Sequence, residues 1–523
     1  MTVGPGDVEA ATGITVDALF RRAIRVFADR VAVTSDRPED GTPWTYRELG
    51  ERADALAAGL HDAGLRRGDR LAVLSETRPE YVELYVAAAR LGVALITLNV
   101  RLHPDELTAI VRSAGPVAVV TTGALADAAA AIRDRTPSVK AWFCTEPRSG
   151  FRDLAELRTA GAPVPEPAAR PDDLHVVLYT SGTTGPPKGA MITQQAAAVR
   201  GLRLAQWFAL TPDDGFIGWL PMFHCAGDES LYGTLLTGGR FACLRRADPA
   251  RILDLVERDR LTWTLLLPGV ITDVLAEPVG DRDVSSFRFA IGYANMMPGV
   301  VTQLTAKYDI DFVDAFGQTE TSYVLVHGWS GPGETPHLRK TPTPLVEVRL
   351  VDADMAEVDV GVPGECVVRG PGLMAGYLDD PDATADVFRG GWLHTGDVLA
   401  RAEDGTLAFV DRVKYLIKTG GENVYPAEVE QALAGHPAVQ EVCAFGVPDP
   451  RWGETVKVAI VLAPGGEMSV DEVAARCRER LAGFKRPHYV QFLAAEELPR
   501  STTGKLQRHV LAERGATAEE YVG

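Results

Sequence analysis

Apolar positions in the first third of the chain follow two alternating patterns, one typical of amphipathic helices and the other of short buried strands. Residues 45–49 open a helical pattern, residues 70–74 form a short apolar run with strand character, and residues 81–91 return to helical spacing. The alternation continues through residues 117–121 and the alanine-rich stretch 125–132. Helices that alternate with short apolar strands predict the α/β class, in which a layered sheet lies between helices.

The next predicted strand, residues 175–179, leads into a stretch that no packing pattern explains. Residues 179–190 hold four Ser or Thr residues, three glycines and one lysine within twelve positions. Glycines let the backbone turn tightly and bring its N–H groups close to an anion, while hydroxyls add further donors. We therefore interpret this stretch as a phosphate-binding loop formed by Thr180, Ser181, Gly182, Thr183, Thr184, Gly185 and Lys188.

Two other interpretations of this loop fit less well. The P-loop of the NTPases needs a glycine directly before its lysine and a Ser or Thr directly after it, whereas Pro187 and Gly189 flank Lys188 here. A flexible Ser/Gly linker needs neither a preceding strand nor a lone lysine. An anion site at the end of a buried strand also agrees with where α/β sheets bind ligands.

Length and charge narrow the range of functions. At 523 residues the chain is long enough for two or more domains. Its 53 Lys and Arg against 71 Asp and Glu give a net charge of −18, which argues against nucleic acid or an anionic membrane as a general partner. The six cysteines are scattered without a Cys-x-x-Cys pair, so we expect neither a disulfide framework nor a structural zinc site.

The N-terminal segment and the apolar runs bear on location. The first twenty residues carry three acids and no basic segment leading into an apolar run, so we expect no secretory signal. The apolar stretches fall short of the roughly 18 to 20 residues that a membrane-spanning helix needs. We therefore expect a cytoplasmic protein with no membrane partner.

A second group of chemistry-bearing residues, 314–320, follows a strand predicted at residues 310–313. Phe316 offers a flat ring that can stack on a base, and Thr319 offers a hydroxyl for a phosphate. The carboxylate of Glu320 suits Mg²⁺, which takes few protein oxygens when phosphates supply the others. This segment therefore fits a nucleotide with its metal ion.

Short strands and frequent turns from residue 346 to 392 predict a small β-barrel-like subdomain. Asp397 follows a glycine turn and can accept both hydroxyls of a ribose, although capping the turn is a common alternative role. Further on, apolar alternation over residues 413–417 predicts a hairpin that turns at Gly420 and Gly421, and Pro426 predicts the start of a helix.

Together these stretches resemble the signature motifs of the adenylate-forming superfamily, which comprises acyl- and aryl-CoA synthetases, peptide-synthetase adenylation domains and firefly luciferase. Residues 179–190 are similar to its phosphate loop, and residues 314–320 to its Tyr-Gly-x-Thr-Glu motif, with Phe316 in place of the tyrosine. The motifs follow in the family's order over nearly the whole chain. The resemblance implies a large N-terminal domain over residues 1–410 and a small mobile α+β domain over residues 411–523.

The resemblance also implies roles for single residues. The catalytic residues would be Lys505, Glu320, Thr319 and His224, with Glu320 as the metal ligand. The nucleotide would further contact Gly292, Tyr293, Ala294, Asp314, Ala315, Phe316, Gly317, Gln318, Asp397 and Arg412. Asp411 would be the hinge, and the channel for a thiol would lie near Lys418, Gly420 and Gly421.

The acyl pocket is expected near His224, where a strand is predicted to end at Pro221 and a helix to begin near Asp228. We expect Asp228 and Glu229 on a solvated helix face; the alternative is an acid that faces the pocket and favours a substrate with an amine or hydroxyl. Residues 292–296 depart from the family's Gly-Gly-Ala-Pro-like segment and reshape the pocket floor. The candidates for the lining are Trp219, His224, Asp228, Val270 and Ser322.

The activity implied by the resemblance uses ATP, Mg²⁺ and CoA. A small-molecule carboxylic acid forms an acyl-adenylate with release of pyrophosphate, and the thiol of CoA then displaces AMP. We interpret the chain first as a freestanding acyl- or aryl-CoA ligase.

Two alternatives stay open. The same adenylation can serve another acceptor, either a carrier-protein phosphopantetheine or an amine, or can activate nitrite for diazotisation of an aryl amine. A degenerate homologue that only binds nucleotide is less favoured, because the chain retains Lys188, Glu320, Asp397, Arg412 and Lys505.

Overall fold

The structure is a computed structural model that describes residues 13–158, 169–180, 187–292, 298–412, 415–419, 422–449, 453–500 and 506–514. The chain forms two compact units. Unit 1 comprises Met1–Val348 and Val368–Leu393, and unit 2 comprises Arg349–Val367 and His394–Gly523. The fold is mixed α/β with a large N-terminal and a small C-terminal part, as predicted, whereas the boundary at residues 410/411 stays a prediction.

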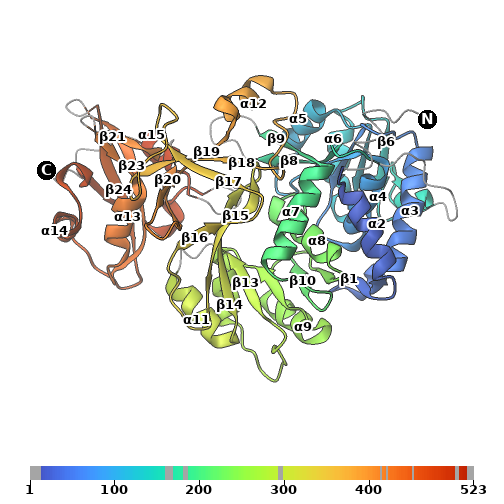
Figure 1. Cartoon of the computed structure of the whole chain (residues 1–523), viewed down its shortest axis with the longest axis horizontal. Helices are drawn as coiled ribbons and strands as arrows, with labels where there is room; N and C mark the ends of the chain where they lie inside the picture. The colour runs from blue at the N-terminus through green and yellow to red at the C-terminus, as the bar shows by residue number, and fades with distance from the viewer. Residues whose placement is uncertain are drawn as a thin grey trace. The chain divides into compact units, whose positions relative to one another are not determined.

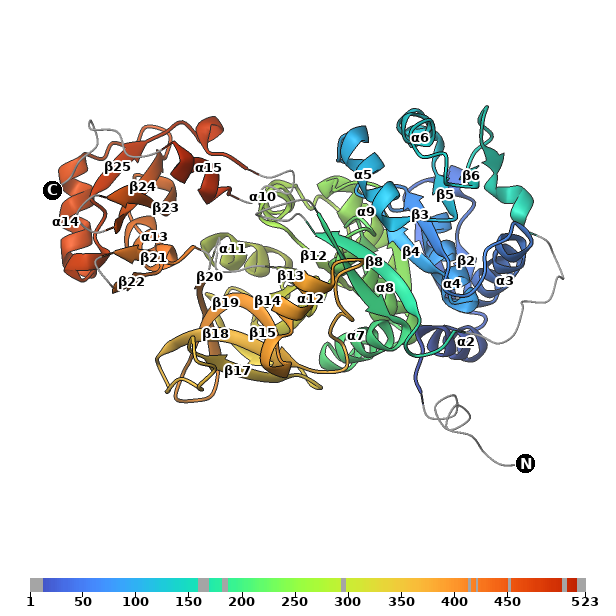
Figure 2. The same cartoon turned by 90° about the horizontal axis from the view of Figure 1, so that it is seen from above.

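The first sheet of unit 1 is parallel except at one edge, where β8 and β9 run antiparallel. Helices cover both of its faces, with α5 and α6 on one side and α4 on the other (Figure 2). The strands, in spatial order, are β7 (Arg152–Asp153), β6 (Ala141–Cys144), β5 (Ala118–Thr121), β3 (Arg70–Leu74), β4 (Ala94–Thr97), β8 (Leu174–Thr180) and β9 (Lys188–Thr193). The helices are α3 (Tyr46–Asp62), α4 (Pro79–Leu91), α5 (Pro104–Ala114) and α6 (Ala126–Arg133).

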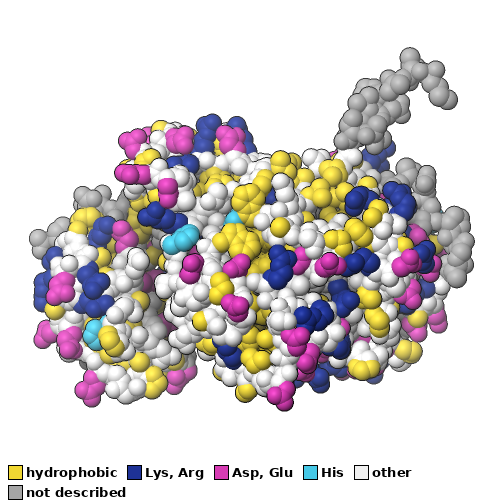
Figure 3. Space-filling model, turned by 60° about the horizontal axis from the view of Figure 1, so that its bottom comes forward, with side chains coloured by type: hydrophobic (Ala, Val, Ile, Leu, Met, Phe, Trp, Pro, Cys, Tyr) yellow, Lys and Arg dark blue, Asp and Glu magenta, His cyan; other side chains and the backbone are white. Residues whose placement is uncertain are grey.

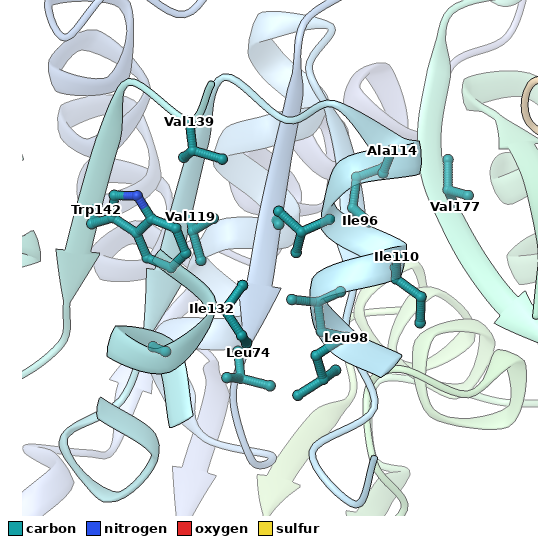
Figure 4. Close-up of a cluster of buried hydrophobic side chains, with 14 of the residues drawn as sticks. Leu74, Ile96, Leu98, Ile110, Ala114, Val119, Ile132, Val139, Trp142 and Val177 are labelled. Atoms are coloured by element: carbon teal, nitrogen blue, oxygen red, sulfur yellow. The ribbon is translucent and has the colours of Figure 1, made fainter. Parts of the chain in front are cut away.

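Local sequence explains where these elements begin and what they bury. Thr45 caps α3 in a capping box with Glu48, which satisfies backbone N–H groups that the first turn leaves unpaired. Figure 4 shows side chains of β3, β4 and β5 meeting those of α5 and α6 in one buried hydrophobic cluster. Removing this apolar surface from water stabilises the layer and holds β8 at a fixed place in the sheet.

The second sheet of unit 1 is parallel over its middle and antiparallel at both edges. Helices α7 and α8 lie side by side beside it (Figure 1). Its strands, in order, are β16 (Arg339–Pro342), β15 (Ser322–Ser330), β14 (Asp311–Gln318), β13 (Phe289–Gly292), β12 (Trp263–Leu265), β10 (Gly215–Gly218), β11 (Arg240–Cys243), β1 (Val31–Ser35) and β2 (Trp44–Thr45). The helices are α2 (Val16–Val26), α7 (Gln194–Trp207), α8 (Cys225–Leu236), α9 (Pro249–Asp259), α10 (Pro268–Ala276) and α11 (Pro298–Tyr308).

Two predicted boundaries differ from the structure. Residues 314–318 do not follow a strand but belong to β14, because pairing with β15 continues the ladder through Gln318. Strand β10 ends at Gly218 rather than near Pro221, and α8 starts at Cys225 rather than near Asp228. The first difference arises because β15 follows β14 directly and places Ser322 opposite Gln318, which extends the ladder beyond residue 313.

Unit 2 contains a five-stranded sheet in the order β22 (Glu422–Val424), β21 (Ile417–Thr419), β24 (Gly453–Leu462), β23 (Val439–Asp449), with β25 (Tyr489–Phe492) beside β24. Strands β21 and β22 pair antiparallel on either side of the predicted Gly420–Gly421 turn. Helix α13 (Pro426–Ala434) starts at Pro426, as predicted. Helices α14 (Val470–Arg480) and α15 (Arg508–Glu513) also belong to unit 2.

Unit 2 also contains most of four neighbouring strands, in the region where the sequence predicts short strands and turns. In order they are β17 (Glu347–Val351), β18 (Pro363–Arg369), β19 (Leu393–Arg401) and β20 (Leu407–Arg412). Helix α12 (Pro381–Val387) lies in the segment between β18 and β19. Strand β19 carries Asp397, and β20 carries Asp411 and Arg412.

The apolar helices and the surface charges both bear on a possible membrane partner. Among the described residues, no helix combines the length and apolar character needed to cross a membrane. On the face seen in Figure 3, acidic and basic side chains are interspersed. The net charge of −18 is therefore not concentrated as one continuous acidic area on this face.

His175 of β8 predicts a loss of stability in acid. It is fully buried against the rings of Tyr85 and Tyr232, and burial lowers its pKa to about 3. Because the unfolded chain binds this proton near pH 6.5, the stabilisation is complete above that pH and is lost as pH falls towards 3. We expect His175 to account for about 2 to 3 kcal/mol of the stability lost between pH 7 and 4.5.

Urea unfolding at pH 7 and pH 4.5 measures this contribution when wild type is compared with His175→Phe. The variant keeps an aromatic ring and lacks the titrating group, so its loss of unfolding free energy on acidification should be smaller. Equal losses in the two proteins would contradict the assignment.

Candidate functional site

The predicted phosphate loop connects two antiparallel strands. Thr180, the last residue of β8, pairs with Lys188, the first residue of β9, and the Thr180 hydroxyl donates to the Lys188 carbonyl at 3.3 Å. Lys188 itself is exposed. The hairpin therefore fixes both ends of the loop. Its predicted donors Ser181, Gly182, Thr183, Thr184 and Gly185 lie outside the described residues.

Residues 374–378 run beside β9 and place a tyrosine next to Lys188. Three backbone hydrogen bonds of 2.7 to 2.9 Å join this segment to β9. They hold Tyr377 so that the Lys188 ammonium lies 5.1 Å from the centre of its ring. A cation at that distance over an aromatic ring is attracted by the ring's electron density.

Glu320 contacts the hydroxyl of the same tyrosine. Its carboxylate is buried and accepts a hydrogen bond of 2.9 Å from the Tyr377 hydroxyl. Its backbone carbonyl accepts a second bond of 2.9 Å from Met374 N–H. Burial and the negative charge of Glu320 raise the pKa of Tyr377, so the hydroxyl stays protonated and donates. Tyr377 thus connects the predicted phosphate-binding lysine with the predicted metal ligand.

The residues around Glu320 are chemically suited to Mg²⁺ that arrives with phosphates. The described residues contain no group of three or more His, Cys, Asp or Glu that could hold a metal ion on their own. One hard carboxylate with hydroxyls nearby is the protein contribution expected where phosphate and water oxygens complete the coordination. Thr319 lies next to Glu320 in sequence, and its hydroxyl is 3.8 Å from Cys225 Sγ.

The residues predicted to hold the base lie on adjacent strands. Gly292, the last residue of β13, pairs with Asp314 of β14. Asp314 and Lys340 form a buried ion pair, while Phe316 and Gln318 are only partly buried. A Cβ on Gly317 would lie 2.1 Å from the Ser322 carbonyl oxygen, so only glycine fits there. Ala315 is buried in the same strand, and Tyr293 and Ala294 lie outside the described residues.

In unit 2 the two predicted ribose ligands form a pair. Asp397 of β19 lies opposite Arg412 of β20, with Arg412 Nε 2.8 Å from Asp397 Oδ1. Asp411 is buried and accepts the Ala427 N–H at 2.9 Å, near the start of α13. Burial raises the pKa of Asp411, and its backbone hydrogen bonds oppose that rise. The predicted hinge side chain is therefore bound to the helix that follows it.

Other predicted residues of this part cannot be placed as side chains. The Lys418 backbone belongs to β21, but its side chain lies outside the described residues. Gly420, Gly421 and Lys505 also lie outside them. Their roles remain predictions.

The pocket candidates differ in their surroundings. Trp219 is buried, and its indole N–H donates to the Leu265 carbonyl at 2.8 Å. His224 is half-buried directly before α8, with its ring 4.8 Å from that of Phe223. Val270 is half-buried in α10.

The prediction that Asp228 and Glu229 face solvent is wrong. Both are at most 1% exposed, because α8 is packed against α7, α2 and β15 and buries every residue from Ala226 to Leu236. Asp228 accepts the Tyr232 hydroxyl at 3.0 Å, and burial together with the neighbouring Glu229 raises its pKa well above the usual range. The predicted pocket residue Ser322 is also buried and donates to Glu229.

Sequence reasoning missed two residues that the structure brings to Glu320. Tyr377 lies in the segment 370–377, where an isolated tyrosine carries no distinguishing signal. Arg200 lies in the alanine-rich α7, where a long cation among small residues was a usable signal of a buried partner. It contacts Glu229 at 2.9 Å and the Glu320 carbonyl at 3.3 Å.

Comparison with known families and sequences agrees with this arrangement. Residues 20–378 match the family described as AMP-binding enzyme, and residues 428–505 match the AMP-binding enzyme C-terminal domain. A feruloyl-CoA synthase from an Amycolatopsis species is 36% identical over 470 residues, which cover 89% of this chain and 93% of the relative. The long-chain-fatty-acid–CoA ligase FadD13 of Mycobacterium tuberculosis is 31% identical over 487 residues, which cover 91% and 94%.

Solved structures with similar folds span nearly the whole chain. ATP-bound MatB from Rhodopseudomonas palustris superposes with a TM-score of 0.83 at 30% identity, covering 96% of this chain and 99% of MatB. The amide bond synthetase McbA from Marinactinospora thermotolerans superposes with a TM-score of 0.84 at 27% identity, with the same two coverages, 96% and 99%.

Proposed function

This chain belongs to the family of AMP-binding enzymes and is an ATP-dependent acyl-CoA synthetase, and on this premise we propose which residues perform each step. The observation that supports the proposal most is the convergence of Lys188 and Glu320 on Tyr377. A phosphate-binding cation and a metal-binding carboxylate at one place suit a polyphosphate substrate with its metal ion.

In the first half-reaction a carboxylate oxygen of the acid attacks the α-phosphorus of ATP. The bond from this phosphorus to the bridging oxygen breaks, and pyrophosphate leaves with the electron pair. Both reactants are anions, so the protein must neutralise charge and align them more than form covalent bonds. We assign Lys505 to the carboxylate and the α-phosphate, and Lys188 with the loop N–H groups to the β- and γ-phosphates.

Mg²⁺ would be held by Glu320 and would neutralise phosphate charge when bound. Tyr377 orients the Glu320 carboxylate by donating to one of its oxygens at 2.9 Å. Thr319 adds a hydroxyl for phosphate. A carboxylate whose orientation is fixed by a hydrogen-bond donor needs less reordering when its ligand arrives.

The nucleoside would be held by two groups of residues. We assign the adenine to Phe316, with the backbone around Gly292 and residues 314–318 beside it. We assign the ribose hydroxyls to Asp397, since Arg412, whose Nε lies 2.8 Å from Asp397 Oδ1, holds that carboxylate in place.

In the second half-reaction the sulfur of CoA attacks the acyl carbonyl, and AMP leaves. Lys505 has no role in this step, so we propose that the C-terminal domain turns about Asp411 between the two half-reactions. The thiol would approach past Lys418, Gly420 and Gly421. We further propose that the enzyme acts in the cytoplasm, where ATP and CoA are available.

For the acid, we propose a short or aromatic carboxylic acid. The ring of Phe223 next to that of His224 supports this assignment. So does the similarity to the feruloyl-CoA synthase and to an indoleacetate–CoA ligase of Aromatoleum aromaticum that is 31% identical over 473 residues. An extended acyl chain would need a long apolar channel instead.

Replacing Tyr377 with phenylalanine should slow adenylate formation by about 10- to 100-fold, because hydrogen bonds to charged groups contribute about 1.5 to 3 kcal/mol. The ring remains beneath Lys188, so the loss isolates the hydroxyl. Pyrophosphate release at saturating acid measures the effect. A rate equal to that of the wild type would show that the Tyr377 hydroxyl does not orient Glu320 for catalysis.

A substrate panel tests the assignment of acid and acceptor. Short, medium-chain, aromatic and amino-substituted aromatic acids, and nitrite, are each supplied with Mg·ATP, with and without CoA. The account predicts pyrophosphate release with an aromatic or short acid and acyl-CoA only when CoA is present. Release with nitrite, or an adenylate that does not react with CoA, would reject CoA as the acceptor.

A further inference from the structure

A buried ion pair lies directly behind the Glu320 backbone. Arg200 of α7 is 1% exposed and Glu229 of α8 is fully buried, and Arg200 Nη1 lies 2.9 Å from Glu229 Oε1. Burying two charges is costly unless their remaining donors and acceptors are also satisfied. The other hydrogen bonds of Arg200 and Glu229 therefore show which segments of the chain this pair fixes in place.

The other two nitrogens of the Arg200 guanidinium donate to two backbone carbonyls. Nε donates to the Gly372 carbonyl at 2.6 Å, and Nη2 donates to the Glu320 carbonyl at 3.3 Å. The first fixes the segment that leads to Tyr377, and the second fixes the residue whose carboxylate Tyr377 contacts. One rigid guanidinium therefore sets the distance between Glu320 and its hydrogen-bond donor.

Glu229 holds the chain just after Glu320, through Ser322. Its second oxygen, Oε2, accepts the hydroxyl of Ser322, two residues after Glu320. Ser322 has a φ of 107°, a backbone conformation that L-residues rarely adopt. A residue in such a conformation persists only where its surroundings hold it. The Glu229 carboxylate provides that support, so the turn after Glu320 is fixed at Ser322.

We propose that Arg200 and Glu229 are positioning residues for the metal and ATP site, and that they aim the Glu320 carboxylate through the carbonyls of Glu320 and Gly372 and the hydroxyl of Ser322. This rests on the proposed role of Glu320. It goes further in assigning a function to charges on α7 and α8 that do not themselves reach the substrates. It also explains why helix α8 carries a buried acid at position 229.

The test uses the full-length enzyme with Arg200→Lys and the double variant Arg200→Met/Glu229→Gln. Lysine keeps the positive charge but cannot serve three acceptors in fixed directions, and the double variant removes both charges of the pair together, so that neither is left buried without the other. Glu83→Gln is the matched control, since Glu83 is fully buried between Arg52 and Arg158 in the same unit and lies outside the proposed site.

Three measurements separate positioning from general stability. Binding of Mn²⁺ with ATP, followed by electron paramagnetic resonance, should weaken by about 10- to 100-fold in both Arg200 variants, the range found when residues that orient metal ligands are replaced. In the same variants the KM for Mg·ATP should rise and the rate of adenylate formation should fall. Thiolysis of a supplied acyl-adenylate, which needs no metal, should stay near the wild-type rate, and Glu83→Gln should alter none of these.

Either of two results would overturn the proposal. One is wild-type binding of Mn²⁺ and ATP in both Arg200 variants. The other is an equal loss in both half-reactions, matched by Glu83→Gln, which would mean that the pair only stabilises the fold. A wild-type enzyme without acid-dependent pyrophosphate release would instead reject the proposed function, so the two failures are distinguishable.

Discussion

Adenylate formation is expected to fall by at least about 10²- to 10³-fold in Lys505→Ala, the range found when one transition-state donor is removed from an active site. The reason is that the ε-ammonium is assigned to the charge that builds up between the carboxylate and the α-phosphate. Thiolysis of a supplied acyl-adenylate should continue at close to the wild-type rate, because that step has no use for this cation. Pyrophosphate release and acyl-CoA formation, measured separately, give the two rates.

Lys485→Ala is the matched control for this variant. Lys485 belongs to the same unit and pairs with Glu428 at 2.8 Å, so its loss removes a lysine and an ion pair without touching the proposed chemistry. We expect little change in either half-reaction. An equal fall of both rates in Lys505→Ala would contradict the division of labour between the half-reactions.

The second large effect is expected for Glu320→Gln, in which adenylate formation should fall by about 10²-fold or more. Glutamine keeps the size of the side chain and can still accept the Tyr377 hydrogen bond, so the local structure should persist. What is lost is the negative charge that suits Mg²⁺. Calorimetric titration with Mg·ATP should show weaker binding, while the unfolding temperature should change little.

Glu146→Gln controls for the loss of a paired glutamate in the same unit, since Glu146 contacts Arg78 at 2.7 Å. It should bind Mg·ATP as the wild type does. If Glu320→Gln also bound Mg·ATP with unchanged affinity, Glu320 could not be the metal ligand.

The elements predicted correctly are those whose signals are local. Thr45 and Glu48 form the capping box that starts α3, and Pro426 starts α13. Strands β21 and β22 pair on either side of Gly420 and Gly421, but the alternation over residues 413–417 overlaps β21 only at Ile417. Each signal involves residues within a few positions of one another. Asp397 and Arg412 are also close in sequence, because the hairpin formed by the consecutive strands β19 and β20 brings them together.

The site residues that were missed or misplaced depend on contacts between distant parts of the chain. Arg200 reaches Gly372 and Glu320 across 172 and 120 positions, and Tyr377 reaches Glu320 across 57. The same separation explains the error at Glu229, whose partner Ser322 is 93 positions away. An acid on a helix is solvated in most proteins, and only the helices and strands packed around α8 reveal otherwise.

Mass spectrometry that follows one acid through both half-reactions tests whether this enzyme forms an acyl-adenylate and passes its acyl group to CoA. The enzyme is incubated with Mg·ATP and an acid identified by the substrate panel, and CoA is added only after the products are sampled. The account predicts acyl-adenylate and pyrophosphate before the addition, and acyl-CoA with AMP after it. Acyl-CoA formed without a detectable adenylate, or an adenylate that persists when CoA is added, would contradict it.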